Sequence, residues 1–344
     1  MSGASVLLVT PYQKQQRGNS ITSQRLQKGL SQLDYEVDLV SLDSSYGWSE
    51  AAQRLSQRGY QLLHVLHAGS VDYVLQRLPA AAELPLILTT TGTDINIDLL
   101  GSQRSKIEKA FNIASRVVVF HHDFVPVLTS IIPTVADKLR VIPQGVDLPD
   151  SPAWSRSRLQ CQADDLIAVL PSGIRPVKRI EWALEAMETA AVYQTNLHLL
   201  IAGPVIDSDY AHAIMNRINQ TPRTKYLGEV KHQEIAGLYK AADMVLNTSL
   251  VEGQPQAALE GMSVGLPVIM SRVPGNLGII TPGKEGFYVE NPQELAEAML
   301  ALADSSSLRR KLGAAAADLV KERYSKTHEW EQYHFVYQEL IGDE

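Results

Sequence analysis

Short runs of apolar, β-forming residues alternate with longer amphipathic stretches along all 344 residues of the chain. The short runs are apolar throughout, which is typical of strands buried on both faces of a parallel sheet. The amphipathic stretches between them have the pattern of crossover helices in βαβ units. In the first half the expected strands are Ser5–Val9, Glu36–Ser41, Leu62–Leu66, Leu86–Thr90, Arg116–Phe120 and Leu139–Ile142.

The same alternation begins again after the proline-containing segment 149–154, where we place a domain boundary. The sequence therefore predicts two Rossmann-like α/β domains with parallel sheets, at residues 1–149 and 150–326. Ligands of such sheets bind at the carboxyl ends of the strands, so we expect the two domains to face an interdomain cleft lined by the loops that follow strands. Strands of the second domain are expected at Leu166–Leu170, Leu197–Ala202, Lys225–Leu227, Met244–Asn247, Pro267–Met270 and Gly286–Val289.

Charge and cysteine content narrow the class of protein. The net charge is −7, and the acidic excess falls entirely in residues 150–344, which argues against nucleic acid as a partner. The single cysteine, Cys161, excludes an intramolecular disulfide and an all-cysteine metal site. The first residues lack the pattern of a signal peptide, and no apolar run is long enough to span a membrane. We expect a cytoplasmic protein without integral membrane association, either a monomer or a homodimer.

The strongest motif is a pair of glutamates, Glu252 and Glu260, with seven residues between them. Pro255 suits a first helical turn, where its missing N–H needs no partner, so Glu252 should precede a helix and Glu260 lie within it. From Gln254 to Glu260 the helix rise is about 9 Å, and carboxylates so separated fit two hydroxyl-bearing parts of one elongated ligand. The helix start would favour an anion between them. The alternative is an exposed glutamate at a solvated helix start; the preceding strand and Gly253 favour the binding site.

A second motif is the basic segment Ser-Gly-Ile-Arg-Pro-Val-Lys-Arg at residues 172–179, which follows an expected strand. Arg175 and Lys178 could converge on a diphosphate, the arginine through its planar fork and the lysine as a point charge. The alternative is a basic loop that only makes a turn soluble. We favour the diphosphate site, because these charges are concentrated after one strand of an otherwise acidic domain.

Weaker candidates follow strands of the first domain. Gly18 and Asn19 lie in a loop where glycine would permit close approach to a ligand, although the G-x-G-x-x-G dinucleotide fingerprint occurs nowhere in the chain. After two later strands, Thr93 and Asp94 offer a hydroxyl and a carboxylate and His121 could reach the cleft, so all three are candidate ligand contacts; Asp94 could equally cap a helix. In the second domain, the Asp-x-Asp spacing at 207–209 occurs in metal-dependent glycosyltransferases, but its place before a helical stretch favours helix capping.

The order of these motifs resembles that of the family 4 retaining glycosyltransferases, which have the two-domain GT-B fold. In this sequence the motifs are Ser-Gly-x-Arg-x-x-Lys at 172–178, Leu-Gly-Glu-Val at 227–230, Glu-x7-Glu at 252–260 and Gly-x-Pro-Val-Ile at 265–269. The resemblance extends over residues 1–344 in layout, and its specific motifs concentrate in 170–290.

The resemblance implies a role for each motif residue. Arg175 and Lys178 would bind the donor diphosphate, Glu252 the donor sugar and Glu260 the ribose hydroxyls; Arg175, Lys178 and Glu252 are the expected catalytic residues. The final helix, at residues 327–344, would cross back to pack on the first domain. No metal and no cofactor are expected, since basic side chains and a helix start would stabilise the leaving diphosphate. The remaining implied donor contacts are Gly18, Asn19, Gly228, Val230, Gly253, Gln254, Pro255 and Gln256.

One departure from the family points to a subgroup. Many members carry a histidine after the fourth strand of the first domain, where this chain has Thr-Gly-Thr-Asp at 91–94. Together with Gly18 and Asn19, this segment resembles the corresponding sequence of the glycosyltransferase-1-domain-containing proteins and the bacterial selenosugar synthases. The resemblance implies a retaining enzyme that moves a hexose or N-acetylhexosamine from a nucleotide donor, UDP-linked, to an unidentified acceptor. The alternatives are transfer to selenophosphate or another small anion, and a nucleotide-sugar binding module without turnover.

Overall fold

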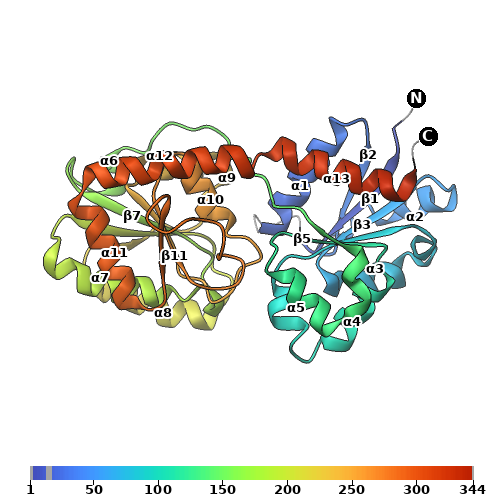
Figure 1. The fold of residues 1–344 in the computed structure, drawn as a ribbon, viewed down its shortest axis with the longest axis horizontal. Helices are drawn as coiled ribbons and strands as arrows, with labels where there is room; N and C mark the ends of the chain where they lie inside the picture. Colours follow the sequence, from blue (N-terminus) through green and yellow to red (C-terminus); the bar gives the residue numbers. More distant parts are fainter. Residues whose placement is uncertain (1–2, 13–17, 343–344) are drawn as a thin grey trace. The chain divides into compact units, whose positions relative to one another are not determined.

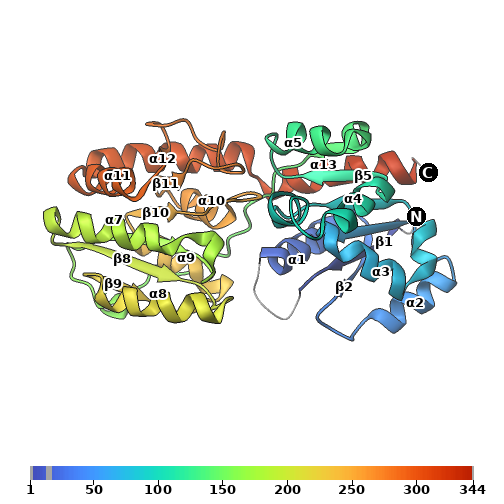
Figure 2. The same ribbon diagram turned by 90° about the horizontal axis from the view of Figure 1, so that it is seen from below.

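The computed structural model describes residues 3–12 and 18–342. Two compact units divide the chain: the first comprises Met1–Gly145 with Tyr324–Glu344, and the second comprises Val146–Arg323. Each unit has one parallel sheet of six strands with helices on both of its faces (Figures 1 and 2). The predicted α/β fold class is therefore confirmed, and every predicted strand agrees with an observed strand to within one residue at either end.

The first unit has the strand order β2-β1-β3-β4-β5-β6. Its strands are β1 (Ser5–Thr10), β2 (Glu36–Ser41), β3 (Leu62–Leu66), β4 (Leu86–Thr89), β5 (Arg116–Val119) and β6 (Leu139–Val141). Its helices are α1 (Gly18–Ser31), α2 (Trp48–Ser56), α3 (Val71–Arg77), α4 (Arg104–Ile113), α5 (Phe124–Ile131) and α13 (Lys326–Ile341). Short helical turns occupy Ala68–Ser70, Pro79–Glu83, Asp94–Asp98 and Pro133–Lys138.

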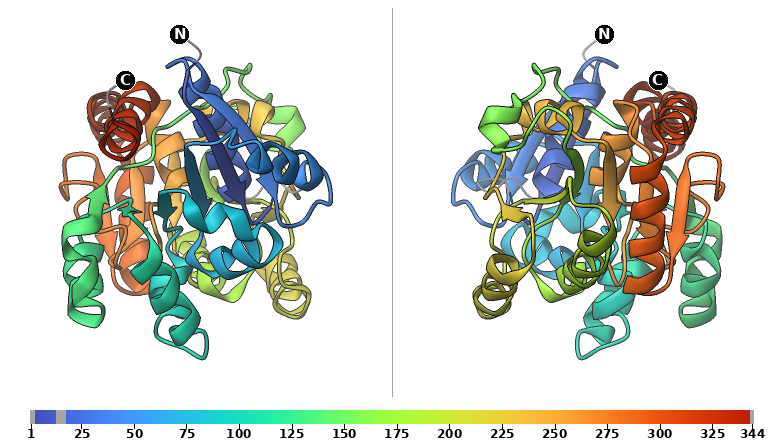
Figure 3. Two further views of the ribbon diagram at one scale, coloured as in Figure 1. Left: turned by 90° about the vertical axis from the view of Figure 1, so that its right-hand side faces the viewer. Right: turned by 90° about the vertical axis from the view of Figure 1, so that its left-hand side faces the viewer.

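Alternation along β1 sends its side chains into two separate cores. Val6 and Leu8 pack with residues of α1 and α13, whereas Leu7 and Val9 pack with residues of α2, α3, α4 and α5. Figure 1 and the left panel of Figure 3 show these helices on the two faces of the blue and cyan strands. Because both faces are covered, the strand has to be apolar at successive positions, which explains the uninterrupted apolar runs of the sequence.

Helix α13 brings the end of the chain back to the first unit. Its Glu329 carboxylate accepts hydrogen bonds from Arg25 of α1, at 2.7 Å from Nε and 2.9 Å from Nη2. Both side chains are buried. The main chain of Lys326 lies so close to Gly145 that a Cβ added there would stand 2.3 Å from the Lys326 Cα atom. The second boundary therefore falls before Tyr324, three residues earlier than the predicted boundary after residue 326.

The second unit has the strand order β12-β11-β10-β7-β8-β9. Helices α9, α10 and α12 cover one face of this sheet, and α7, α8 and α11 cover the other (Figure 1). The strands are β7 (Leu166–Pro171), β8 (Leu197–Ala202), β9 (Thr224–Tyr226), β10 (Met244–Asn247), β11 (Val268–Ser271) and β12 (Gly286–Val289). The helices are α6 (Arg156–Leu159), α7 (Ile180–Tyr193), α8 (Ser208–Gln220), α9 (His232–Ala241), α10 (Gln256–Ser263), α11 (Pro292–Asp304) and α12 (Ser306–Arg323). Among the described residues, we find no helix that combines the length and the apolar character needed to cross a membrane.

The first domain boundary also lies earlier than the sequence predicts. The predicted boundary follows residue 149, but the chain already belongs to the second unit from Val146. His232, at the start of α9, hydrogen bonds through Nε2 to the carbonyl oxygen of Asp147 at 2.9 Å. The main-chain N–H of Trp154 donates to Gly237 of the same helix. Packing against α9 thus holds the proline-containing segment to the second unit.

A buried histidine gives the first unit a predictable response to pH. His64 of β3 is fully buried between the hydroxyls of Tyr337 and Thr89, at 2.7 and 2.8 Å from its two ring nitrogens. Burial lowers the pKa of His64 from 6.5 to about 3. As the pH falls below 6.5, the unfolded state therefore takes up a proton that the folded state does not accept, and the free energy of unfolding falls by about 1.4 kcal/mol per pH unit.

Between pH 7 and pH 5 we expect His64 alone to reduce the free energy of unfolding by about 2 kcal/mol. Urea unfolding of the wild type and of His64→Asn at both pH values measures this term, because the variant should lack it. The matched control is His328→Asn, whose side chain is 55% exposed and which should keep the wild-type dependence on pH. Equal pH dependence of His64→Asn and the wild type would contradict the assignment.

Candidate active site

The two strongest sequence motifs follow neighbouring strands, β7 and β10, at the centre of the second sheet. From β7 the chain builds β8 and β9 on one side, and then returns to add β10, β11 and β12 on the other. The strand order therefore reverses between β7 and β10. In open α/β sheets this reversal separates the loops at the carboxyl ends of the two strands and leaves a crevice where ligands bind.

Lys178 and Glu252 bring the two motifs together. The Lys178 Nζ atom lies 2.6 Å from Oε1 of Glu252, although the residues are 74 positions apart in the sequence. The lysine side chain is 18% exposed and the glutamate side chain 11%. A charge pair at this depth is held in a defined geometry, and both groups remain within reach of a ligand at the carboxyl edge of the sheet.

Two further side chains orient the Glu252 carboxylate. Ser249 Oγ donates to Glu252 Oε1 at 2.6 Å, and Asn247 Nδ2 donates to the same oxygen at 3.0 Å. Asn276 in turn donates from Nδ2 to Asn247 Oδ1 at 3.2 Å. Burial by itself would raise the pKa of Glu252, but the Lys178 ammonium and the hydrogen bonds from Lys178, Ser249 and Asn247 outweigh it, and the pKa is lowered. Glu252 is therefore ionised at neutral pH.

Hydrogen bonds from side chains to main-chain carbonyl oxygens hold the two loops together. The Arg179 guanidinium donates to the carbonyl oxygens of Thr248 and Ser249, at 3.0 and 2.8 Å. Thr248 Oγ1 donates to the carbonyl oxygen of Lys178 at 2.8 Å. Arg179 has a positive φ of 44°, a conformation that is costly for a residue with a side chain. The structure accommodates it at the turn between Lys178 and α7, where the guanidinium contacts stabilise it.

Glu260 lies within α10, as the proline position predicts. Its side chain is buried and accepts a hydrogen bond from the hydroxyl of Tyr239 at 3.2 Å. Burial, reinforced by the Glu260 carboxylate, raises the pKa of Tyr239 well above its usual value, so this hydroxyl stays protonated and keeps donating. Pro255 stands immediately before α10 rather than inside it. The solvated helix start with an exposed glutamate is not what the structure shows.

The other predicted donor contacts differ in burial and in backbone conformation. Arg175 is half-buried in extended backbone directly before the short helical turn Pro176–Lys178. Gly228 follows β9 with a positive φ of 75°, and a Cβ there would meet nothing within 4 Å, so the glycine serves the backbone conformation and leaves open space. Val230 is half-buried. Gly253 and Gln254 are buried before α10, and Gln256, the first residue of α10, is half-buried.

In the first unit, the predicted residues follow β1, β4 and β5. Gly18 is exposed and Asn19 half-buried at the start of α1, while Arg17 and the other residues of 13–17 lie outside the described part of the chain. Asp94 is fully buried, and its carboxylate accepts hydrogen bonds from the main-chain N–H groups of Ala68, Thr91 and Gly92. Asp94 therefore holds the loops after β3 and β4 together instead of presenting an accessible carboxylate.

Two histidines follow β3 and β5, the strands on either side of β4. His121, after β5, is half-buried, and burial lowers its pKa. His67, after β3, was not singled out by the sequence reasoning. Its φ is +72°, and Nε2 lies 3.3 Å from Thr93 Oγ1 and 3.5 Å from Asp98 Oδ2. The available signal was its position directly after a buried strand, but only the structure reveals the unusual backbone and the contact with Thr93.

The Asp-x-Asp segment is a helix cap. Asp207 Oδ1 accepts a hydrogen bond from the main-chain N–H of Tyr210 at 2.9 Å, at the start of α8. This is the usual role of an aspartate at such a position, and it confirms the capping interpretation.

Comparisons with known proteins agree with this architecture. Residues 166–305 match the family model described as "Glycosyl transferases group 1". Glycosyltransferase 1 domain-containing protein 1 of Xenopus tropicalis is 25% identical over 335 residues, 94% of each chain. The N-acetyl-alpha-D-glucosaminyl L-malate synthase of Bacillus anthracis is 22% identical and covers 86% of this chain and 79% of its own.

Solved structures show the same fold over nearly the whole chain. Anabaena HepE, in complex with UDP and glucose, has a TM-score of 0.81 at 17% identity and covers 98% of this chain and 100% of its own. Sucrose-phosphate synthase from Thermosynechococcus elongatus also has a TM-score of 0.81, at 19% identity, and covers 98% and 99%. The chain is a glycosyltransferase with the GT-B fold, and residues 166–305 are its group 1 domain. The predicted resemblance to the family 4 enzymes is thereby confirmed.

Proposed function

We propose that the chain is a retaining glycosyltransferase that moves a hexose or N-acetylhexosamine from a UDP-sugar to an acceptor. The observation that carries the proposal is the 2.6 Å contact between Lys178 and Glu252 at the reversal of strand order. It places a cation suited to a diphosphate beside a carboxylate suited to sugar hydroxyls. A solved structure of similar fold supports the donor, since Anabaena HepE forms a complex with UDP-glucose.

In this proposal the donor lies along the loops after β7 and β10. The Arg175 guanidinium and the Lys178 ammonium bind the diphosphate and stabilise the negative charge that develops as it leaves. Glu252, held by Ser249 and Asn247, accepts hydrogen bonds from hydroxyls of the sugar. Glu260, about one turn into α10, binds the ribose hydroxyls. These basic groups and the start of α10 supply the positive charge, so the proposed mechanism is independent of metal.

Retention follows if the acceptor attacks from the face of the leaving group. The acceptor oxygen then forms a bond to the anomeric carbon as the bond from that carbon to the diphosphate oxygen breaks. The departing diphosphate oxygen takes the proton of the acceptor, so no side chain has to serve as the general base. The ion pair of Lys178 with Glu252 would separate on donor binding, with the ammonium turning to phosphate and the carboxylate to sugar.

Thermal unfolding with nucleotides tests the donor site. UDP, GDP and ADP and their common sugar conjugates are added to the wild type and to Glu260→Gln. A ligand at 100 times its Kd that binds only the folded state adds about 2.7 kcal/mol of stability. We expect a shift with UDP and UDP-sugars in the wild type, and a much smaller shift in Glu260→Gln, because an amide is a weaker acceptor for the ribose hydroxyls than a carboxylate.

The matched control is Glu297→Gln in α11, whose side chain is exposed and which should keep the full nucleotide shift. Preference for GDP or ADP would overturn the assignment of the base. No shift with any nucleotide would contradict the donor site itself. Binding of a UDP-sugar without release of UDP, over a broad set of acceptors that includes selenophosphate, would instead identify a binding module without turnover.

A further inference from the structure

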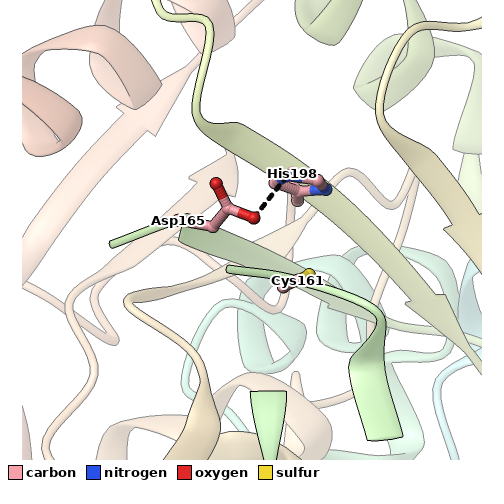
Figure 4. A group of neighbouring side chains, drawn as sticks. All are labelled: Cys161, Asp165 and His198. Carbon is pink, nitrogen blue, oxygen red and sulfur yellow. Dashed lines mark ion pairs between the residues drawn. The ribbon is translucent and has the colours of Figure 1, made fainter. Parts of the chain in front are cut away.

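A cluster of three metal-ligating side chains lies in the second unit, away from the loops that carry the donor motifs. Cys161, Asp165 and His198 offer a thiol, a carboxylate and an imidazole, and one ligand atom of each lies within 4.8 Å of the others. Figure 4 shows the three side chains gathered beside the first residues of β8, with the Asp165 carboxylate directed at the His198 ring. Among the residues that the structure describes, no other group of this kind is found.

The cluster lies at the opposite edge of the sheet from the donor site. Asp165 immediately precedes β7 and His198 is the second residue of β8, so both stand where these parallel strands begin. The motif residues follow the far end of β7. At roughly 3.3 Å per residue, the six residues of β7 separate the two places by about 20 Å. A ligand in the cluster would therefore not touch a donor bound by Lys178 and Glu252.

The hydrogen bonds within the cluster leave the imidazole only partly satisfied. His198 Nε2 lies 3.0 Å from Asp165 Oδ2, but the buried Nδ1 atom has no hydrogen-bond partner in the described chain. Nε2 is the ring nitrogen that faces the Asp165 carboxylate, so an ion bound by both residues would be held by Nε2 and would replace their contact. Nδ1 would then carry the ring proton.

The segment that carries Cys161 is held in place by other contacts. Lys225 donates from Nζ to the carbonyl oxygens of Leu159 and Gln160, at 2.9 Å each. Asp165 Oδ2 also accepts a hydrogen bond from the main-chain N–H of Gln162 at 2.6 Å. The thiol and the carboxylate are therefore presented by a fixed turn. The Lys225 ammonium is bound to the main-chain oxygens of the two residues that precede Cys161.

We propose that Cys161, Asp165 and His198 bind a divalent zinc ion. Sulfur, imidazole nitrogen and carboxylate oxygen together are a donor set that zinc prefers. Tetrahedral ligands at about 2.0–2.3 Å from the ion lie roughly 3.3–3.6 Å from one another, so closing the cluster requires shifts of about an ångström. A water molecule would complete the coordination. The ion would cross-link the turn after α6 to β8, and it takes no part in sugar transfer.

Cobalt titration of the tag-free full chain tests the proposal. Cobalt(II) occupies zinc sites and shows a charge-transfer absorption only when a thiolate is a ligand. Because the chain has a single cysteine, that absorption reports on Cys161 alone. We expect it to saturate at one equivalent of cobalt and to disappear when zinc is added. It should be absent in Cys161→Ala, and His198→Gln and Asp165→Asn should weaken cobalt binding by at least about tenfold.

Two exposed residues of the second unit provide matched controls. Asp164→Asn and His212→Gln alter exposed side chains of the same types and should leave the absorption unchanged. A second readout is thermal unfolding, in which zinc should raise the midpoint of the wild type but not that of Cys161→Ala. Cys161→Ala should retain its UDP-dependent shift, so failure of the zinc site and failure of the donor site are distinguishable. No thiolate absorption at saturating cobalt, or full absorption in His198→Gln, would overturn the proposal.

Discussion

Replacing Lys178 with alanine should lower the rate of sugar transfer by about 10²–10³-fold, the usual effect of removing one group that stabilises transition-state charge. The ammonium stands 2.6 Å from Glu252 and, in the proposed mechanism, faces the diphosphate as its negative charge develops. Release of UDP from a UDP-sugar, followed at saturating donor, measures the effect on turnover.

The matched control for this change is Lys311→Ala in α12, an exposed lysine whose removal should leave turnover within about twofold of the wild type, because exposed substitutions away from a site usually have small effects. Thermal unfolding of Lys178→Ala without ligand checks that the variant is folded. A near-normal rate in a folded Lys178→Ala protein would remove Lys178 from the catalytic residues and would leave Arg175 as the diphosphate ligand.

The largest effect on stability is expected from Arg25→Met. Arg25 binds both oxygens of Glu329 in α13, and the two side chains are 2% and 0% exposed. Removing the arginine leaves a buried carboxylate without its cation, and breaking such a pair costs about 3–5 kcal/mol. Urea unfolding at neutral pH should show this loss. The double variant Arg25→Met/Glu329→Leu should recover most of it, because two apolar side chains avoid the desolvation cost of an unpaired charge.

An exposed ion pair serves as the matched control. Arg104 bonds to Glu108 at 2.7 Å, but its side chain is 60% exposed. Arg104→Met should therefore change the free energy of unfolding by less than about 1 kcal/mol. If Arg25→Met were no more destabilising than Arg104→Met, the buried pair would not be what anchors α13 to α1.

Most of the fold could be predicted because its signal is local. A strand buried on both faces must be apolar at successive positions, and runs such as Leu62–Leu66 show this directly. The boundaries of the two units could not be predicted as well. Prolines in segment 149–154 indicate a break in secondary structure, but the contacts of Asp147 and Trp154 with α9 involve residues far along the chain. Those contacts decide which unit the segment joins.

The candidate site divides in the same way. Residue type and spacing predict that Lys178, Glu252 and Glu260 are binding groups, because each lies after a strand or inside a helix that the sequence predicts. Asp94 had an equally suitable position, yet the structure buries it beneath three main-chain N–H groups. His67 was missed, because its positive φ and its approach to Thr93 depend on how β3 and β4 pair.

The sequence by itself determined the two α/β units, the strand positions and the types of charged group that follow the central strands of the second sheet. The apolar runs of the strands and the amphipathic repeat of the helices are local patterns, so residues only a few positions apart are enough to specify these features. Only the tertiary structure decided that β10 pairs with β7, because strand order depends on long-range contacts. That pairing brings Lys178 to Glu252 across 74 positions. The length of β7 separates their loops from the Cys161, Asp165 and His198 cluster, which lies where β7 and β8 begin.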